Sequence, residues 1–142
     1  MRRAWILVLG LLSTLPGGAR ERAAQYVVIG NPGTVPVRIE RAVLADVFLK
    51  KAHEWPGGEN ARPVDLPAQS AVRDEFTREV LGRSIGAVRN YWAQVLFSGR
   101  DLPPPELSEA EVLKYVRSTR GAVGYVGVAQ PLDDLTVVQV SE

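Results

Sequence analysis

The chain has 142 residues, of which 46% are hydrophobic and 23% are charged, and its formal net charge is +1. This composition is typical of a globular protein, and the length suits one domain. The basic residues are scattered along the chain, which argues against a nucleic-acid-binding surface. Because cysteine is absent and His53 is the only histidine, neither a zinc site nor a cysteine nucleophile is expected.

The beginning of the chain predicts a secretory signal peptide. Arg2 and Arg3 form a short positive region, and the apolar run 4–15 follows them directly. This run is too short to span a membrane, which needs about 20 apolar residues. Small residues precede a cleavage site after Ala19, and a cut after Ala24 is the alternative. We therefore expect an exported, periplasmic protein with a signal peptide at 1–19 and a single domain at 20–142.

Strands and helices alternate along the rest of the chain. Apolar runs bounded by turn residues predict strands at 25–30, 63–66, 122–126 and 135–140. Apolar positions at helical spacing predict helices at 39–51, 70–82, 84–98 and 108–120. The uninterrupted apolar run at 25–30 is typical of a strand buried on both faces of a parallel sheet. The order predicts an α/β domain with a mostly parallel sheet, flanked by helices on both faces.

Several segments, in this order and at these spacings, resemble a known family. They are the helix ending at Phe48, Trp55 before Pro-Gly-Gly, the segment 70–76, Trp92 with Phe-Ser-Gly-Arg at 97–100, and Gly-Ala-Val-Gly-Tyr-Val at 121–126. Together they resemble one lobe of the phosphate-type substrate-binding proteins of bacterial ABC transporters, which belong to the periplasmic binding protein superfamily (type II-like). Full-length members have two lobes that close on the ligand. The resemblance therefore implies a short, single-lobe member.

The resemblance also implies a ligand site at the helix that begins at Ser70. In these relatives a Ser-Gly-Thr sequence opens this helix, and its hydroxyls and backbone amides hold phosphate. Here Ala71 and Val72 stand where Gly and Thr are expected. The free N–H groups and the dipole of a helix start favour an anion, and Arg73, one turn in, would add positive charge.

Two further ligand residues are expected by analogy with open α/β sheets. Asn31 and Thr34 follow the first predicted strand, and ligands of such sheets tend to sit beyond the carboxyl ends of strands. Simpler roles remain for the two candidates at the helix start: Ser70 can be only a helix cap, and Arg73 can be a solvated or salt-bridged surface residue.

Two functions follow from these observations. The first is an exported binding protein for phosphate or a similar small oxyanion, connected with ABC-type phosphate uptake or sensing. The second is an interaction module that kept the fold, lost the ligand, and pairs with a partner protein or a second copy of itself. No enzymatic activity is expected, since no nucleophile–base pair, metal cluster or paired carboxylates can be read from the sequence. No cofactor is expected either.

Overall fold

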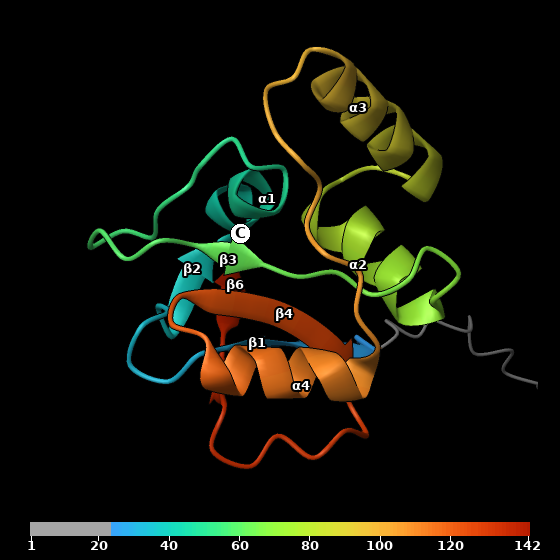
Figure 1. The fold of residues 1–142 in the computed structure, drawn as a ribbon. Coiled ribbons are helices and arrows are strands. Elements are labelled where there is room, and N and C mark those ends of the chain that lie inside the picture. The colour runs from blue at the N-terminus through green and yellow to red at the C-terminus, as the bar shows by residue number, and fades with distance from the viewer. Residues whose placement is uncertain (1–23) are drawn as a thin grey trace, which may run out of the picture.

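Residues 24–142 are described by the computed structural model, so the predicted signal peptide at 1–19 lies outside the described residues. The described residues form four helices and six strands (Figure 1). The helices are α1 (Arg41–Phe48), α2 (Ala71–Val80), α3 (Ile85–Phe97) and α4 (Glu109–Ser118). The strands are β1 (Tyr26–Gly30), β2 (Arg38–Glu40), β3 (Arg62–Pro63), β4 (Ala122–Gly127), β5 (Thr136–Val137) and β6 (Gln139–Ser141). The predicted α/β class is confirmed.

The main sheet has the strand order β3-β4-β1-β5, and β2 pairs with β6 in a second, two-stranded sheet. The pairs β3–β4 and β2–β6 are parallel, as expected. However, β1 runs antiparallel to both of its neighbours, β4 and β5. This corrects the expected direction of the first strand. An uninterrupted apolar run shows that a strand is buried on both faces, and burial alone does not fix the direction of the neighbouring strands.

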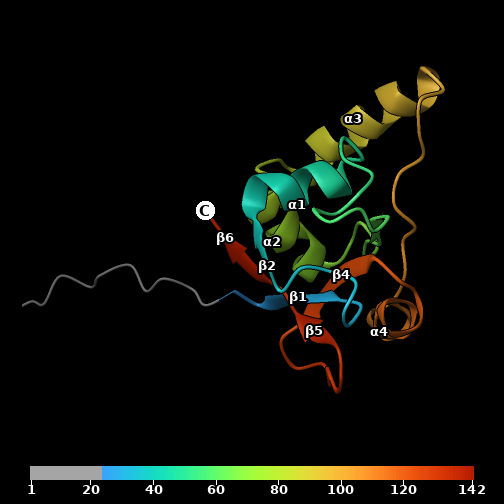
Figure 2. The same ribbon diagram turned by 90° about the vertical axis from the view of Figure 1, so that its left-hand side faces the viewer.

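Helices cover both faces of the main sheet, as predicted (Figure 2). On one face, Tyr125 of β4 packs against Phe48 of α1 and Phe76 of α2. On the other face, Gly124 lies so close to α4 that an added Cβ would be 2.7 Å from Val112. Successive residues of a strand point to opposite faces, so neighbouring positions of β4 hold α2 and α4 in place.

The predicted helix starts are confirmed at Ser70, Ser84 and Ser108. Each of these serines is an N-cap, and its side-chain oxygen accepts a hydrogen bond from the backbone N–H three residues later. Such a bond satisfies one of the free donors of the first helical turn. The positions of α2, α3 and α4 along the chain therefore follow from local sequence.

Three predicted elements have different bounds in the structure. The helix expected at 39–51 is preceded by β2 and ends at Phe48, shortly before Lys50 takes a positive φ of 54°. The strand expected at 135–140 divides into β5 and β6, because Val138 between them turns inward and its N–H bonds to Val28 of β1. The strand expected at 63–66 is the shorter β3, and its last bond to the sheet runs from the Val64 N–H to the Val123 carbonyl of β4.

Beyond β3, the backbone of Asp65 pairs with a distant segment. Its N–H donates to the Pro105 carbonyl at 2.9 Å, and its carbonyl accepts from the N–H of Leu107 at 2.8 Å. The chain between these points contains α2, α3 and a proline-rich linker, and it returns to the place where it left. Within residues 24–142, no helix combines the length and apolar character needed to cross a bilayer.

Candidate functional site

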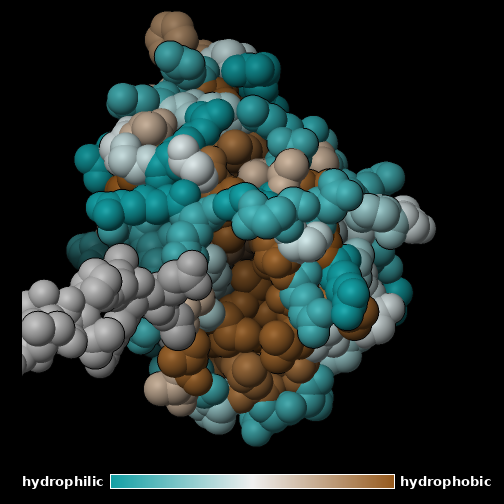
Figure 3. All heavy atoms as spheres, turned by 180° about the vertical axis from the view of Figure 1, so that it is seen from behind, coloured by the Kyte–Doolittle hydropathy of each residue, from teal (hydrophilic) through white to brown (hydrophobic). Residues whose placement is uncertain are grey.

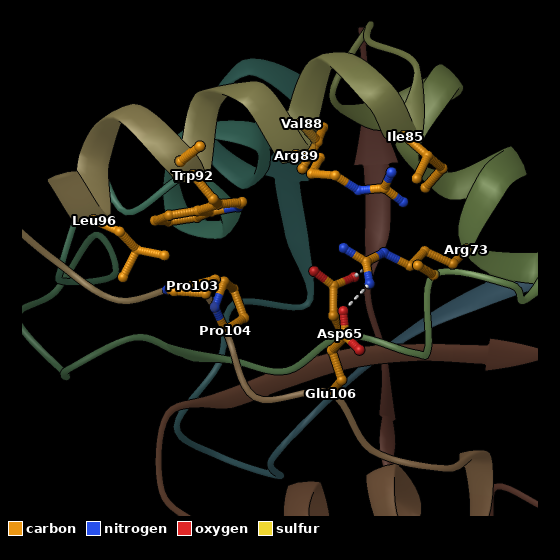
Figure 4. A pocket seen from close by; sticks show the side chains of 12 residues that line it. Asp65, Arg73, Ile85, Val88, Arg89, Trp92, Leu96, Pro103, Pro104 and Glu106 are labelled. Atoms are coloured by element: carbon orange, nitrogen blue, oxygen red, sulfur yellow. Dashed lines mark hydrogen bonds and ion pairs between the residues drawn. The ribbon is translucent and has the colours of Figure 1, made fainter.

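Helix α3 stands apart from the main core (Figure 1). Its inward residues Val88, Trp92 and Val95 form a small apolar cluster of their own. Between α3, the β3–α2 connection and the proline-rich linker lies a cavity of about 330 Å³ (Figure 4). Organic ligands are typically bound in cavities of about this size, with an apolar lining and a few polar groups. This cavity is the candidate ligand site.

The two ends of the cavity differ in chemistry (Figure 4). One end is apolar and is lined by Trp92, Leu96, Pro103 and Pro104. The other end carries one charged side chain from each of four segments, the β3–α2 connection, α2, α3 and the linker before α4: Asp65, Arg73, Arg89 and Glu106.

Arg73 of α2 is the central charged group, and its side chain is buried, with 7% of the residue exposed. Its Nη1 donates to Oε1 of Glu106 at 2.6 Å and to the Leu66 carbonyl at 2.8 Å. Its Nε lies 3.6 Å from Oδ1 of Asp65 and has no hydrogen-bond partner within residues 24–142. The alternative of a salt-bridged arginine is therefore confirmed, whereas its expected place at the surface is wrong. Burial is possible because two carboxylates balance the charge.

Asp65 connects this cluster to the sheet, because the buried Tyr125 hydroxyl donates to its carboxylate. Burial raises the pKa of the Asp65 carboxyl above its ordinary value, against the opposing effects of Arg73 and of the Tyr125 hydroxyl. Burial and the Asp65 carboxylate also raise the pKa of Tyr125. Burial alone would lower the pKa of Arg73, but Asp65 and Glu106 outweigh it and raise that pKa. Arg73 thus stays charged, whereas burial makes the ionised form of Asp65 less favourable than it is in water.

Arg89 of α3 differs from Arg73 because it has no counter-ion among residues 24–142. Its guanidinium points toward that of Arg73 across the charged end of the cavity (Figure 4). Within the described part of the chain it makes no ion pair or hydrogen bond. Two guanidinium groups that face each other repel unless an anion lies between them. The geometry therefore suits the binding of a negatively charged group.

The predicted site at the start of α2 has a different environment. The Ser70 hydroxyl accepts a hydrogen bond from the Arg73 N–H at 3.2 Å, as a helix cap. Ala71 and Val72 border a separate hollow on the other side of α2. That hollow is also lined by three carboxylates and one cation, so its net charge is negative: Asp74, Glu75, Glu79 and Arg78, which pairs with Asp74. These charges oppose an anion at the start of α2.

Asn31 and Thr34 do not join the other predicted ligand residues. The Asn31 amide donates to the carbonyls of Val116 and Arg117 at the end of α4. The Thr34 hydroxyl donates to the Asn31 side chain at 2.6 Å and accepts from the Gly121 N–H at 2.8 Å.

These bonds place Asn31 and Thr34 at the start of β4. Val72 lies at the other end of that strand, 3.8 Å from the position of a Cβ added to Gly127. Strands of this length span about 17–20 Å. The structure therefore separates two groups of residues that the sequence interpretation had placed in one site.

Asp65, Arg89 and Glu106 were missed as site residues. One signal was present in the sequence: Arg89 stands three residues before Trp92, so the two side chains share a helix face. No comparable signal marks Glu106, which reaches Arg73 from 33 residues away. Among residues 24–142, no group of His, Cys, Asp and Glu side chains is arranged to hold a metal ion.

No protein-family model matches the chain, and no curated protein matches it. Among solved structures, it is similar to an ABC-type phosphate transport receptor from Vibrio cholerae, with a TM-score of 0.62, 13% identity, and coverage of 82% of this chain and 46% of that chain. The chain has the fold of the phosphate-type substrate-binding proteins. The resemblance noted in the sequence is confirmed at the level of fold.

Two further structures support this fold. PstS from Borrelia burgdorferi has a TM-score of 0.61 and 15% identity, with coverage of 83% of this chain and 47% of that chain. A Clostridium perfringens protein, described as a phosphate ABC transporter substrate-binding protein with bound phosphate, has a TM-score of 0.62 and 17% identity. The match covers 82% of this chain and 44% of the Clostridium perfringens protein. The chain thus spans less than half the length of each neighbour, as expected for one lobe of this fold.

Proposed function

We propose that the chain is an exported, periplasmic binding protein for phosphate or a similar small oxyanion, connected with ABC-type phosphate uptake or sensing. The observation that supports this most is Arg89, a cation without a partner in residues 24–142 that points at Arg73 inside a cavity. Guanidinium groups match the geometry of phosphate and carboxylate oxygens and bind them through paired hydrogen bonds. Similarity of fold to proteins described as phosphate receptors agrees with this ligand class. No enzymatic activity is part of the proposal.

In this proposal Arg89 binds the anion directly and Arg73 supplies the opposite wall. The charge of Arg73 is already balanced by Asp65 and Glu106, so Arg89 provides the uncompensated charge. The alternative place for the anion is the start of α2, where Ala71 and Val72 present backbone N–H groups, whereas the Ser70 N–H donates to the Pro67 carbonyl. We favour the cavity because the carboxylates beside Ala71 and Val72 oppose an anion there.

A calorimetric titration of the purified protein tests the proposal, with phosphate, sulfate and a neutral solute at low salt. Low salt matters because mobile ions screen charges on an open site. We expect saturable binding of phosphate that Arg89→Leu weakens about tenfold or more, as the loss of a charge-assisted hydrogen bond predicts. Arg38→Leu is the matched control, since it removes the same charge from an exposed position on β2.

Each outcome of this titration has a clear meaning. Loss of affinity in Ser70→Ala, with full affinity in Arg89→Leu, would move the anion to the start of α2. An equal loss in Arg38→Leu and Arg89→Leu would show a general charge effect without a site. No saturable binding of any anion would reject the proposed function.

The second candidate is an interaction module, favoured by exposed hydrophobic surface. Phe97 at the end of α3 is 98% exposed. Figure 3 shows a hydrophobic area on the face seen from behind. A partner protein or a second copy of the chain would cover such surface. Light scattering over a range of concentrations should then show a dimer that Phe97→Ser weakens and Asn90→Ser, at an exposed polar position of the same helix, does not. A monomer at every concentration, with no partner recovered, would count against this candidate.

A further inference from the structure

The cavity is much larger than a bare oxyanion requires. Its volume of about 330 Å³ corresponds to roughly ten water molecules at about 30 Å³ each. A tetrahedral oxyanion bound by Arg89 would fill only the charged end. The rest of the space would hold water against apolar side chains, which is unfavourable.

The apolar end has the shape of a slot. Trp92 forms one wall of it, and Pro103 and Pro104 from the linker form the facing wall (Figure 4). Leu96 closes the same end. Flat, rigid side chains on opposite walls favour a flat or compact hydrophobic group between them.

The walls of this slot hold their positions without a ligand. Trp92 is packed into its own cluster and is 6% exposed. The linker is fixed where Asp65 bonds to Pro105 and Leu107. A cavity with walls held in this way loses little conformational freedom when a ligand enters.

From this segregation of charge and apolar surface we infer that the natural ligand is an organic anion. One end of it carries a phosphate, phosphonate or carboxylate group that meets Arg89. The other end is an aromatic or branched apolar group that fills the slot between Trp92 and the two prolines. The inference rests on the proposed function for the anionic end, and it goes further in giving the ligand a hydrophobic body.

The test compares probes that share one head group or one body. Phenylphosphonate carries both parts, inorganic phosphate carries only the anion, and benzyl alcohol carries only the ring. Calorimetry of the purified protein should show phenylphosphonate binding at least tenfold more tightly than phosphate. Tryptophan fluorescence, to which Trp92 contributes, should change with phenylphosphonate.

Two surface variants distinguish binding of the apolar part of the ligand from binding of its anionic group. Leu96→Ser should weaken phenylphosphonate several-fold and leave phosphate unchanged, because Leu96 lines only the apolar end. Its side chain is half exposed, so folding is expected to survive the change. Val37→Ser, at an exposed site outside the cavity lining, should change neither affinity.

The outcomes distinguish this inference from the proposed function. Phosphate binding as tightly as phenylphosphonate would overturn the inference and leave the proposed function standing. Benzyl alcohol binding as tightly as phenylphosphonate would overturn both, since the charge would then contribute nothing. Absence of binding by all probes would also overturn both.

Discussion

The ring of Phe76 in α2 stacks on the ring of Tyr125 in β4, with centroids 3.8 Å apart and planes 8° from parallel. This contact joins the helix that carries Arg73 to the central part of the sheet. The hydroxyl of the same tyrosine bonds to Asp65. The charged end of the cavity is therefore positioned by the hydrophobic core, and its geometry depends on the packing of β4.

Tyr125→Phe should keep this stack and lose the hydroxyl that satisfies Asp65. A buried carboxylate without its donor costs about 1–3 kcal/mol, so the free energy of unfolding should fall by about that amount in a urea titration. Tyr26→Phe is the matched control, because it removes a tyrosine hydroxyl that bonds Glu79 at an exposed position, and its effect should stay near 0.5 kcal/mol. Equal effects of the two variants would contradict a special role for the Tyr125–Asp65 bond.

The titration of Asp65 should make a measurable contribution to the pH dependence of the free energy of unfolding. Burial raises the pKa of Asp65, so the folded protein keeps this proton to a higher pH than the unfolded chain. The protonated Asp65 carboxyl therefore contributes to the free energy of unfolding. This contribution is complete below the pKa of Asp65 in the unfolded chain, about 3.9, and it is lost as the pH rises through the pKa of Asp65 in the folded protein.

The unfolding free energies of wild type and Asp65→Asn, measured along a pH series, isolate this contribution. Other titrating groups are common to both proteins and cancel in the difference. The difference, wild type minus variant, should fall as the pH rises above about 3.9, by at most about 1.4 kcal/mol per pH unit. A difference that increases with pH would show that the pairing with Arg73 outweighs burial.

Asn31→Ala should destabilise the fold and leave ligand affinity unchanged. The variant removes the donor to two carbonyls at the end of α4 and the acceptor for Thr34, at a cost of about 1–3 kcal/mol. Asn90→Ala, on the exposed side of α3, is the control and should change stability by about 0.5 kcal/mol or less. A marked loss of phosphate affinity in folded Asn31→Ala would restore Asn31 as a ligand residue.

Gly121→Ala should be far more damaging than Gly99→Ala, although both glycines have a positive φ, of 73° and 68°. The left-handed conformation alone costs alanine about 1–2 kcal/mol, and this is the whole effect expected at Gly99, where an added Cβ meets nothing within 4 Å. At Gly121 the Cβ would lie 1.8 Å from the carbonyl oxygen of Asn60. The forced shift should add about 1–3 kcal/mol. Similar melting temperatures for the two variants would contradict this close approach.

The features that the sequence predicted correctly depend on local interactions. Ser70, Ser84 and Ser108 start helices because each caps a backbone N–H only three residues away. The alternation of strands and helices follows from apolar periodicity, which is also local. The direction of β1 depends on the route of the whole chain, so its own residues could not reveal it.

The candidate site was harder to predict because its groups come from distant segments. Arg73 alone has the sequence context of a surface arginine. It is buried only because Glu106, 33 residues later, and Asp65 approach it in the folded state. Asn31 and Thr34 attract attention as polar residues after a strand, yet their hydrogen bonds are used within the fold. A sequence pattern shows which polar groups exist and not which of them are already satisfied.

The paired backbone bonds of Asp65 with Pro105 and Leu107 have a consequence for how this fold can vary. They join the two ends of the segment 66–104, which leaves the sheet and returns to it at the same point. Sequence changes around 98–102, far from these bonds, would alter the distance between α3 and the cavity prolines Pro103 and Pro104 without shifting the register of the strands. The size of the cavity and the stability of the sheet can therefore evolve, or be engineered, separately.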